Sequence, residues 1–237
     1  MAGMMRRGPH SDFPATAHSS LAGLAWPGLA SQLGTNLLAL LYQLEQSQWW
    51  SEGQLQRHQL RQLAHLMQHA MTSTPYYREH RRAWGIGGEW QLTEQSFAAA
   101  LPILTRAEVQ QGGAAFHAAT LPEGHGEIGD TFTSGSTGRP LKTLKTGLSE
   151  IMWQAITLRE ILWHRDFRLK LGVITRNEDA GGGYPDGVQS KKWRGFTGQA
   201  FITGPSCVLD VRTKIHQQVE WLARMKPNYL FTRAGNA

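Results

Sequence analysis

The sequence predicts an α/β fold in which helices pack on a mixed β-sheet, and two patterns carry this prediction. Apolar residues recur at helical spacing over 54–71, 147–163 and 215–225, as they do on the buried faces of amphipathic helices. Short apolar runs at 169–175 and 229–231 have the length of strands, and they alternate with the helices along the chain. Alternation of this kind is typical of helices that cover a sheet.

The chain is long enough for one large domain or two small ones, and we expect one. Its 237 residues, 41% of them hydrophobic, can bury a sizeable core. Residues 1–20 are expected to form a disordered leader and residues 21–237 the domain, which opens with a leucine-rich helix extending to about Trp50. Proline and glycine interrupt the apolar stretch 21–41, so it is typical of neither a membrane span nor a secretion signal.

The helix expected over 54–71 has an apolar face and a stripe of histidines opposite it. Pro75 is expected to end the helix. His65 and His69 have the i, i+4 spacing of a metal-binding pair, but no cysteine or acidic residue accompanies them. We therefore expect a solvent-facing stripe and assign no metal ligand. The apolar face consists of Leu60, Leu63, Leu66, Met67 and Ala70.

Capping and turn residues predict where the next elements begin and end. Thr105 followed by Glu108 forms a capping box, so a short helix should start there and end at the two glycines 112–113. Three consecutive glycines within 177–187 predict a loop.

The last part of the chain predicts two short strands and a further helix. The strands are expected at 201–202 and 208–209, on either side of a Gly-Pro pair. Asp210 or Thr213 can cap the helix over 215–225, because both side chains accept hydrogen bonds from backbone N–H groups.

Charge and cysteine content limit the class of protein. The formal net charge is +6, from 24 Lys and Arg against 18 Asp and Glu, which tolerates anionic ligands without requiring nucleic acid. The basic clusters within 78–82 and 191–194 are short enough to be solvated surface. Cys207, the single cysteine, excludes an internal disulfide and fits a reducing compartment, here taken as the cytoplasm. It is expected to fill space beside a strand rather than to act as a nucleophile.

The segment from Thr133 to Lys142 has a composition that points to a polyanionic ligand. It consists of Thr-Ser-Gly-Ser-Thr-Gly-Arg-Pro-Leu-Lys, so backbone N–H groups, hydroxyls and positive charge can converge on phosphate oxygens. A Walker-type P-loop is excluded, because only two residues separate Gly135 from Gly138. The flanking residues predict a strand, a glycine-hydroxyl loop and a returning strand. An ordinary flexible turn is the alternative, since the same residue types populate turns.

This segment resembles the phosphate-binding signature of adenylate-forming enzymes, the superfamily of acyl-CoA synthetases, luciferases and peptide-synthetase adenylation domains. Within that superfamily it looks most like the branch of phenylacetate-CoA ligase, coenzyme F390 synthetase and capsular-polysaccharide CapK-like proteins. Segments similar to that branch precede it in the expected order: Pro-Tyr-Tyr at 75–77, Trp-Gly-Ile at 84–86 and Leu-Pro-Ile-Leu-Thr-Arg at 101–106. The resemblance extends from about Gln48 to the last residue.

The resemblance implies the activation of a small-molecule carboxylate. The carboxylate attacks the α-phosphate of ATP, pyrophosphate leaves, and a thiol such as coenzyme A captures the acyl-adenylate, while Mg²⁺ shares the phosphate oxygens. No catalytic residue is assigned, and neither nucleic acid nor a membrane is an expected partner. A homo-oligomer is compatible with the sequence. The residues expected to bind the β- and γ-phosphates are Thr133, Ser134, Gly135, Ser136, Thr137, Gly138, Arg139 and Lys142.

The chain departs from the family pattern in two respects. Many members have a lysine directly after the loop proline, but here Leu141 takes that place and Lys142 follows. A shift of one residue turns a strand side chain to the other face, so Arg139 is the alternative cation. The downstream motifs of the family, which include a magnesium-binding glutamate and a catalytic lysine, are not found. We therefore expect an inactive first half with an incomplete sheet, or alternatively a non-catalytic nucleotide- or partner-binding module.

Overall fold

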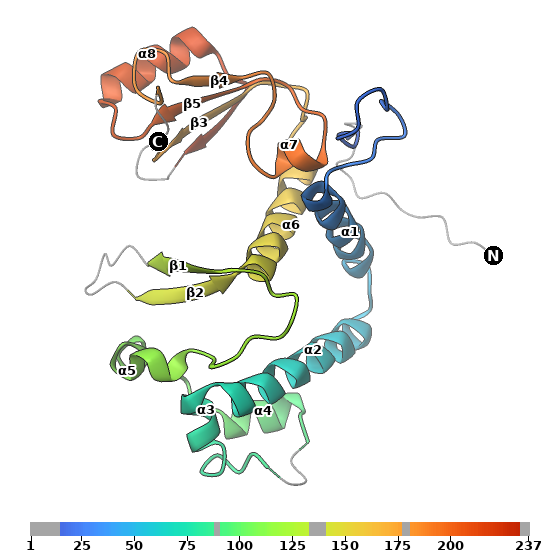
Figure 1. Ribbon diagram of the computed structural model, residues 1–237, viewed down its shortest axis with the longest axis vertical. Coiled ribbons are helices and arrows are strands. Elements are labelled where there is room, and N and C mark those ends of the chain that lie inside the picture. Colours follow the sequence, from blue (N-terminus) through green and yellow to red (C-terminus); the bar gives the residue numbers. More distant parts are fainter. Residues whose placement is uncertain (1–14, 88–90, 133–140, 177–180, 233–237) are drawn as a thin grey trace, which may run out of the picture. The chain divides into compact units, whose positions relative to one another are not determined.

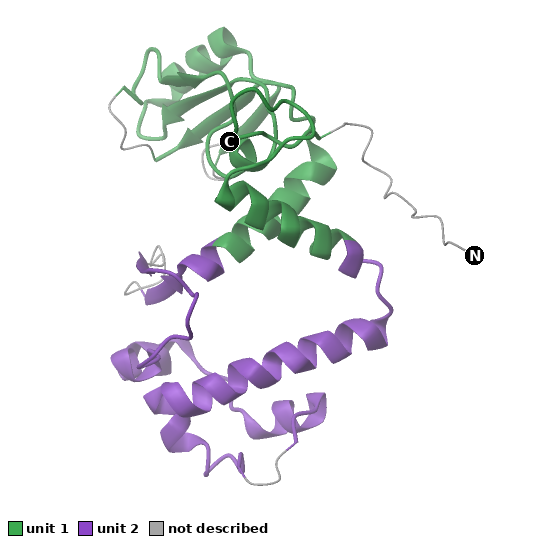
Figure 2. Cartoon of the chain, turned by 45° about the vertical axis from the view of Figure 1, so that its right-hand side comes forward, with its two compact units in different colours: residues 1–45, 151–237 green, residues 46–150 purple. Residues whose placement is uncertain are grey.

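The structure is a computed structural model, of which residues 15–87, 91–132, 141–176 and 181–232 are described. The chain divides into two compact units, of which unit 1 contains residues 1–45 and 151–237 and unit 2 contains residues 46–150 (Figure 1, Figure 2). Residues 46–150 enclose an apolar cluster of their own.

Unit 1 contains a helical layer made by most of α1 (Gln32–Ser47) and most of α6 (Gly147–His164). Leu37 of α1 and Leu158 of α6 are fully buried in the same apolar cluster, which anchors the two helices to each other. Trp163 strengthens this contact, since its Nε1 donates to Glu45 Oε1 at 3.1 Å. The helix expected after residue 147 is therefore confirmed, whereas the one expected over 21–50 begins only at Gln32.

The segment before α1 differs from the expected disordered leader. Ala17 forms a β-bridge with Phe201, and the Ile202 N–H donates to the Thr16 carbonyl at 2.8 Å. Thr16, Ala17 and His18 therefore have specific backbone partners, and the prediction is wrong for them. Those partners lie far away in sequence, so local composition did not indicate the pairing. Residues 1–14 lie outside the described residues.

A four-stranded mixed sheet forms the second layer of unit 1. Its order is β4 (Val188–Ser190), β5 (Ser206–Asp210), β3 (Leu171–Thr175) and β6 (Tyr229–Thr232). β3 runs parallel to both β5 and β6, and β4 is antiparallel to β5. The structure is therefore mixed α/β, as the sequence predicted. The strand expected at 201–202 is wrong, because only an isolated bridge forms there.

Helix α8 (Ile215–Met225) connects β5 to β6 and covers one face of the sheet (Figure 1). Trp221 of α8, which is fully buried, packs against Cys207 and Leu209 of β5. On the opposite face of the sheet, Leu171 and Tyr229 pack against the apolar cluster shared by α1 and α6. The short helix α7 (Thr197–Ala200) contributes Ala200 to that same cluster.

The predicted cap of α8 is wrong. Its N-cap is Lys214, which makes no side-chain capping hydrogen bond. Asp210 accepts instead from the backbone N–H and the guanidinium of Arg212, so its carboxylate faces the preceding turn. The buried Gln218 secures the helix start, because its Nε2 donates to the carbonyls of Val211 and Thr213.

Unit 2 is largely helical in its first part. The long α2 (Glu52–Ser73) begins with a capping box between Ser51 and Gln54, and Pro75 starts α3 (Pro75–His80) directly after it. On the predicted apolar face Met67 is buried, but Leu66 is 59% exposed. The remaining helices of this part are α4 (Glu94–Ala100), α5 (Arg106–Gly112) and the 3₁₀ turn η1 (Gly113–Phe116).

Helix α5 confirms the predicted capping box. Thr105 Oγ1 accepts from the Glu108 N–H at 3.2 Å, and Glu108 Oε2 accepts from the Thr105 N–H at 2.7 Å. The helix ends at Gly112, and its C-cap residue Gly113 has a φ of 47°. Such a positive φ favours glycine, because it lacks the Cβ that would clash there.

Candidate functional site

The glycine-hydroxyl segment belongs to a connection between two paired strands of unit 2. β1 (Ile128–Phe132) and β2 (Lys142–Thr146) form an antiparallel two-stranded sheet, as the sequence predicted. Of the expected phosphate-binding residues, Lys142 is described, and those from 133 to 139 lie outside the described residues.

The register of the hairpin fixes where the connection starts and ends. Phe132 is the Cα partner of Lys142, and Asp130 is the partner of Leu144. Directly opposed residues in an antiparallel pair lie about 5 Å apart between Cα atoms. Both ends of the connection are therefore held beside each other. Thr143 adds one further link across the strands, since its Oγ1 donates to the Thr131 carbonyl at 3.2 Å.

Lys142 has an acidic partner on the same face of the hairpin. Its Nζ lies 2.8 Å from Asp130 Oδ2, and both side chains are 47% exposed. The two residues are diagonal neighbours across the strands, a spacing that long side chains can bridge. An exposed ion pair of this kind contributes at most about 1 kcal/mol, so the lysine can exchange partners at small cost. The carboxylate would nevertheless repel an anion that approached Lys142.

Helix α6 begins directly after β2 and has a well-defined start. Thr146 Oγ1 accepts from the Ser149 N–H at 3.2 Å, and Ser149 Oγ accepts from the Thr146 N–H at 3.0 Å. The Gly147 N–H donates to the Glu127 carbonyl at 3.0 Å, which ties the helix start to the residue before β1. The base of the hairpin is thus fixed on both strands.

A second candidate site, an apolar cavity in unit 2, was missed by the sequence analysis. It has a volume of about 490 Å³. The Pro-Tyr-Tyr and Leu-Pro-Ile-Leu segments that line it had been noted only for their family resemblance. The density of aromatic residues between 76 and 97 was the one signal in the sequence, but sequence alone does not show that this stretch packs against residues 101–104. The lining residues are Tyr77, Trp84, Phe97, Ala98, Leu101, Pro102, Ile103 and Leu104.

Two aspartates in unit 1 form the same local arrangement with an arginine two residues later. Asp166 accepts from the backbone N–H and the guanidinium of Arg168, and Asp210 does so from Arg212. Each carboxylate is almost completely buried, whereas each arginine side chain is about two-thirds exposed. The Arg168 guanidinium lowers the pKa of Asp166. These pairs stabilise two turns, and the arginine charges are already matched.

The remaining residues singled out by the sequence lie as follows. His58 and His65 are exposed, and His69 is half-buried with its Nδ1 3.4 Å from Ser73 Oγ. Cys207 is completely buried, which raises the pKa of its thiol and fits the expected space-filling role. The three basic residues within 191–194 are exposed around the buried Trp193.

The described residues were also compared with the requirements of metal sites and membrane spans. Within them, no group of three or more His, Cys, Asp or Glu side chains is placed to hold a metal ion. None of the helices in the described ranges combines the length and the apolar character needed to cross a bilayer.

Comparison with known proteins assigns no family to the chain. No protein-family model matches it, and no curated protein matches it.

Proposed function

We propose that the β1–β2 hairpin presents the segment from Thr133 to Lys142 to the phosphates of ATP, in a protein related to AMP-forming acid–thiol ligases. The observation that carries this proposal is the antiparallel register, in which Phe132 faces Lys142. That pairing holds both ends of the segment together, so its glycine N–H groups and hydroxyls can converge on one polyanion. The family resemblance adds the reaction, in which a carboxylate is activated with ATP and transferred to a thiol.

The described residues fit ATP only in part. Lys142 stands at the end of the segment and is half exposed, so it can reach a phosphate oxygen. Asp130 neutralises part of its charge, however, and this fits the expectation that Lys142 does not simply take the role of the family lysine. Arg139 stays the alternative cation of this proposal. Mg²⁺ and coenzyme A enter through the resemblance alone.

A second candidate function is a non-catalytic module that binds a protein partner through the hairpin. Ile128 and Leu144 lie on the same face of the two strands and are 56% and 39% exposed. Two apolar side chains that stay in water on a two-stranded sheet favour a covering partner. Replacing both residues by serine should abolish partner binding under this reading and leave ATP binding unchanged.

Calorimetric titration of the full chain with Mg²⁺–ATP tests the leading proposal. Replacing Gly135 by valine should weaken ATP binding at least about tenfold, because the added side chain blocks close approach of the backbone to phosphate. Gly129→Val is the matched control, since Gly129 lies in β1 and nothing lies within 4 Å of the position of an added Cβ. Equal affinities of the two variants, or no detectable ATP binding by the parent protein, would overturn the proposal.

Pyrophosphate exchange then separates the ligase from the non-catalytic module. The full chain is incubated with ATP, labelled pyrophosphate and a panel of aryl and fatty acids. Acid-dependent exchange that disappears in Gly135→Val supports carboxylate activation by this chain. If ATP binds but no acid of the panel supports exchange, the enzymatic part of the proposal is wrong, whereas ATP binding by the segment 133–142 is retained.

A further inference from the structure

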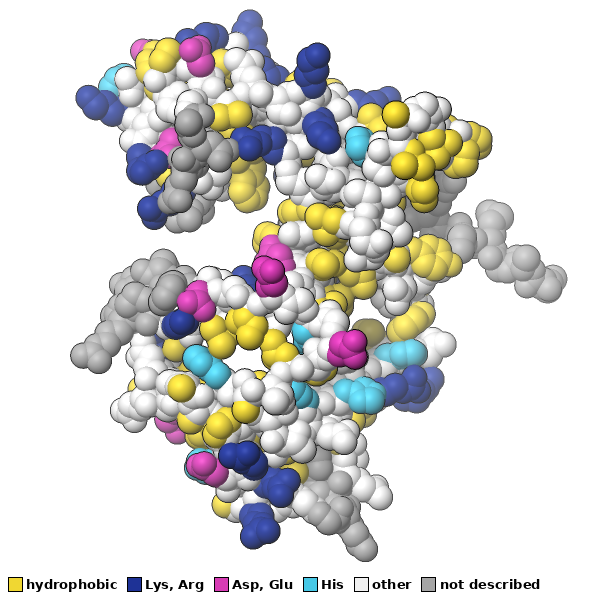
Figure 3. Space-filling view, viewed as in Figure 1, with side chains coloured by type: hydrophobic (Ala, Val, Ile, Leu, Met, Phe, Trp, Pro, Cys, Tyr) yellow, Lys and Arg dark blue, Asp and Glu magenta, His cyan; other side chains and the backbone are white. Residues whose placement is uncertain are grey.

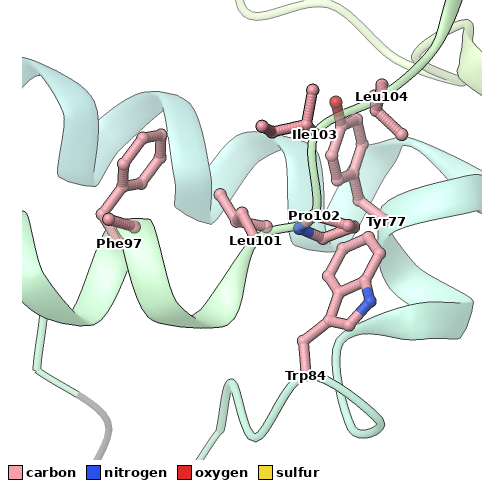
Figure 4. Close-up of a pocket in the computed structure, with 8 residues that line it drawn as sticks. Tyr77, Trp84, Phe97, Leu101, Pro102, Ile103 and Leu104 are labelled. Atoms are coloured by element: carbon pink, nitrogen blue, oxygen red, sulfur yellow. The ribbon is translucent and has the colours of Figure 1, made fainter.

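The cavity of unit 2 has the size and the walls of a site for a small aromatic molecule. Its volume of about 490 Å³ falls in the usual range of ligand pockets. In Figure 4, Phe97 of α4 and Leu101, which follows that helix, lie to one side of the segment from Pro102 to Leu104, and the ring of Tyr77 lies to the other. The side chains of this wall are hydrocarbon except for the Tyr77 hydroxyl and the Trp84 indole N–H.

Trp84, one of the residues that line the cavity, is held in place by a series of stacked rings. Trp84 stacks on His80 with 5.5 Å between ring centroids, His80 stacks on Tyr76 at 4.5 Å, and Tyr76 stacks on Phe116 at 4.1 Å. His80 is further fixed because its Nδ1 lies 2.8 Å from the Tyr76 carbonyl oxygen. A wall that is already ordered loses little conformational entropy when a ligand binds.

The segment between these side chains contains an isoleucine that is almost fully exposed to solvent. Ile103 is 94% exposed, although its neighbours Leu101 and Leu104 are half-buried. A large aliphatic side chain at the mouth of an apolar cavity gains contact area once a ligand covers it. The mouth is therefore suited to an apolar body rather than to water.

Positive charge gathers at the C-terminal end of α3, the helix that supplies Tyr77. Arg78, Arg81 and Arg82 follow it within five residues, against Glu79 as the acidic side chain of that run. The Arg81 N–H donates to the Tyr77 carbonyl at 3.0 Å, so the two residues are one helical turn apart and share a face. Among described residues none of the three arginines forms an ion pair. Figure 3 shows Lys and Arg side chains gathered over the lower end of unit 2, where α3 lies in Figure 1.

We propose that this cavity binds a small amphipathic anion, whose one or two aromatic rings enter between Trp84 and Phe97 while its negative group faces Arg81. The apolar walls supply the contact area, and the Arg81 guanidinium, which has no ion-pair partner among the described residues, selects the charge of the ligand. Burial raises the pKa of Tyr77, so its phenol stays neutral and can donate a hydrogen bond at the rim. The site shares no residue with the proposed phosphate-binding segment 133–142, and the proposal does not depend on that segment.

Fluorescence titration with a matched pair of probes tests this site on the full chain. The anion 1-anilinonaphthalene-8-sulfonate and the neutral N-phenyl-1-naphthylamine share their rings and differ by the sulfonate. Replacing Ala98 by leucine should weaken the binding of both probes at least about tenfold, because the larger side chain would take up space in the cavity that Ala98 lines. Ala98 is exposed, so the replacement leaves the apolar core of unit 2 unchanged. Ala99→Leu is the matched control, since Ala99 is exposed on the same helix and does not line the cavity. Circular dichroism verifies that both variants keep the helical content of the parent.

Arg81→Gln tests the selection of charge. It should weaken the sulfonate probe severalfold and leave the neutral probe unchanged. The proposal is overturned if Ala98→Leu and Ala99→Leu bind the probes equally, or if Arg81→Gln affects both probes alike. It is also overturned if neither probe binds, or if sedimentation shows that Ala98→Leu dissociates a dimer, because a second copy would then fill the cavity.

Discussion

The sheet of unit 1 and the hairpin of unit 2 use β-structure in opposite ways. All five residues of β5 are buried, because β3 and β4 flank the strand and α8 covers one of its faces. In the hairpin, by contrast, Ile128 and Leu144 are 56% and 39% exposed, and the described strands add no third member to the sheet. The sheet is thus stabilised by burial of its own side chains, whereas the hairpin leaves surface available for a ligand or partner.

This difference predicts a gradient of local stability within the molecule. An isolated two-stranded sheet is marginally stable in water, and segments with few buried contacts open at low free-energy cost. The hairpin should therefore exchange its amide hydrogens sooner than β3 and β5. A ligand that binds the hairpin would stabilise it by mass action and would leave the sheet of unit 1 unaffected.

The largest effect is expected from Trp221, which fills the space between α8 and the sheet. Its side chain is fully buried, and its Nε1 donates to the Asp186 carbonyl at 3.2 Å. Trp221→Ala should lower the free energy of unfolding of unit 1 by about 3–5 kcal/mol, as for other large-to-small core replacements. Urea titration followed by circular dichroism measures the loss. Val219→Ala, at a 60% exposed site of the same helix, should change it by less than about 0.5 kcal/mol.

A smaller effect is expected from Met71, which belongs to the apolar cluster of unit 2. It is 6% exposed and packs with Met67 and Ile86. Met71→Ala should cost about 2 kcal/mol, and Gln68→Ala, at an exposed site of the same helix, should cost little. Hydrogen exchange read by mass spectrometry should show faster exchange in residues 46–150 alone. Equal acceleration in peptides of β3 and β5 would show that the two units unfold as one.

The elements that the sequence predicted well are those set by local signals. The capping box at Thr105, the helix after residue 147 and the strands around the glycine segment all depend on residues a few positions apart. The elements it missed depend on distant partners. The bridge between Ala17 and Phe201 joins residues far apart in sequence, and no local pattern reports it.

The candidate sites also differ in whether local residues or distant partners determine them. Composition alone indicated the phosphate-binding segment, but the ion pair between Lys142 and Asp130 requires the strand register, which periodicity does not supply. The cavity requires the contact of α3 with the segment after α4, which no spacing within either segment encodes. Asp210 or Thr213 was expected to cap α8, yet the carboxylate of Asp210 accepts from Arg212 instead.

Acidification should lower the stability of unit 1 through Asp166. Hydrogen bonds from Arg168 lower the pKa of this carboxyl below its ordinary value of about 3.9 in the folded state. Its contribution to stability is therefore present above that ordinary pKa and is lost as the pH falls through the lowered one. Asp166→Asn should be less stable than the parent at neutral pH, and the difference should shrink in the acid range. Urea midpoints measured from pH 7 down to pH 3 test this, with Glu160→Gln on an exposed part of α6 as control.

The smallest effect on stability, and the sharpest test of the hairpin, is expected from the pair of Asp130 and Lys142. Because both side chains are half exposed, Asp130→Asn and Lys142→Gln should each change the free energy of unfolding by less than about 1 kcal/mol. Their effects on Mg²⁺–ATP affinity should have opposite signs, since the first removes a repelling charge and the second an attracting one. Both shifts should diminish in high salt, where exposed charges are screened. If calorimetry finds the same sign for both variants, Lys142 does not contact the phosphates, and Arg139 becomes the cation to test.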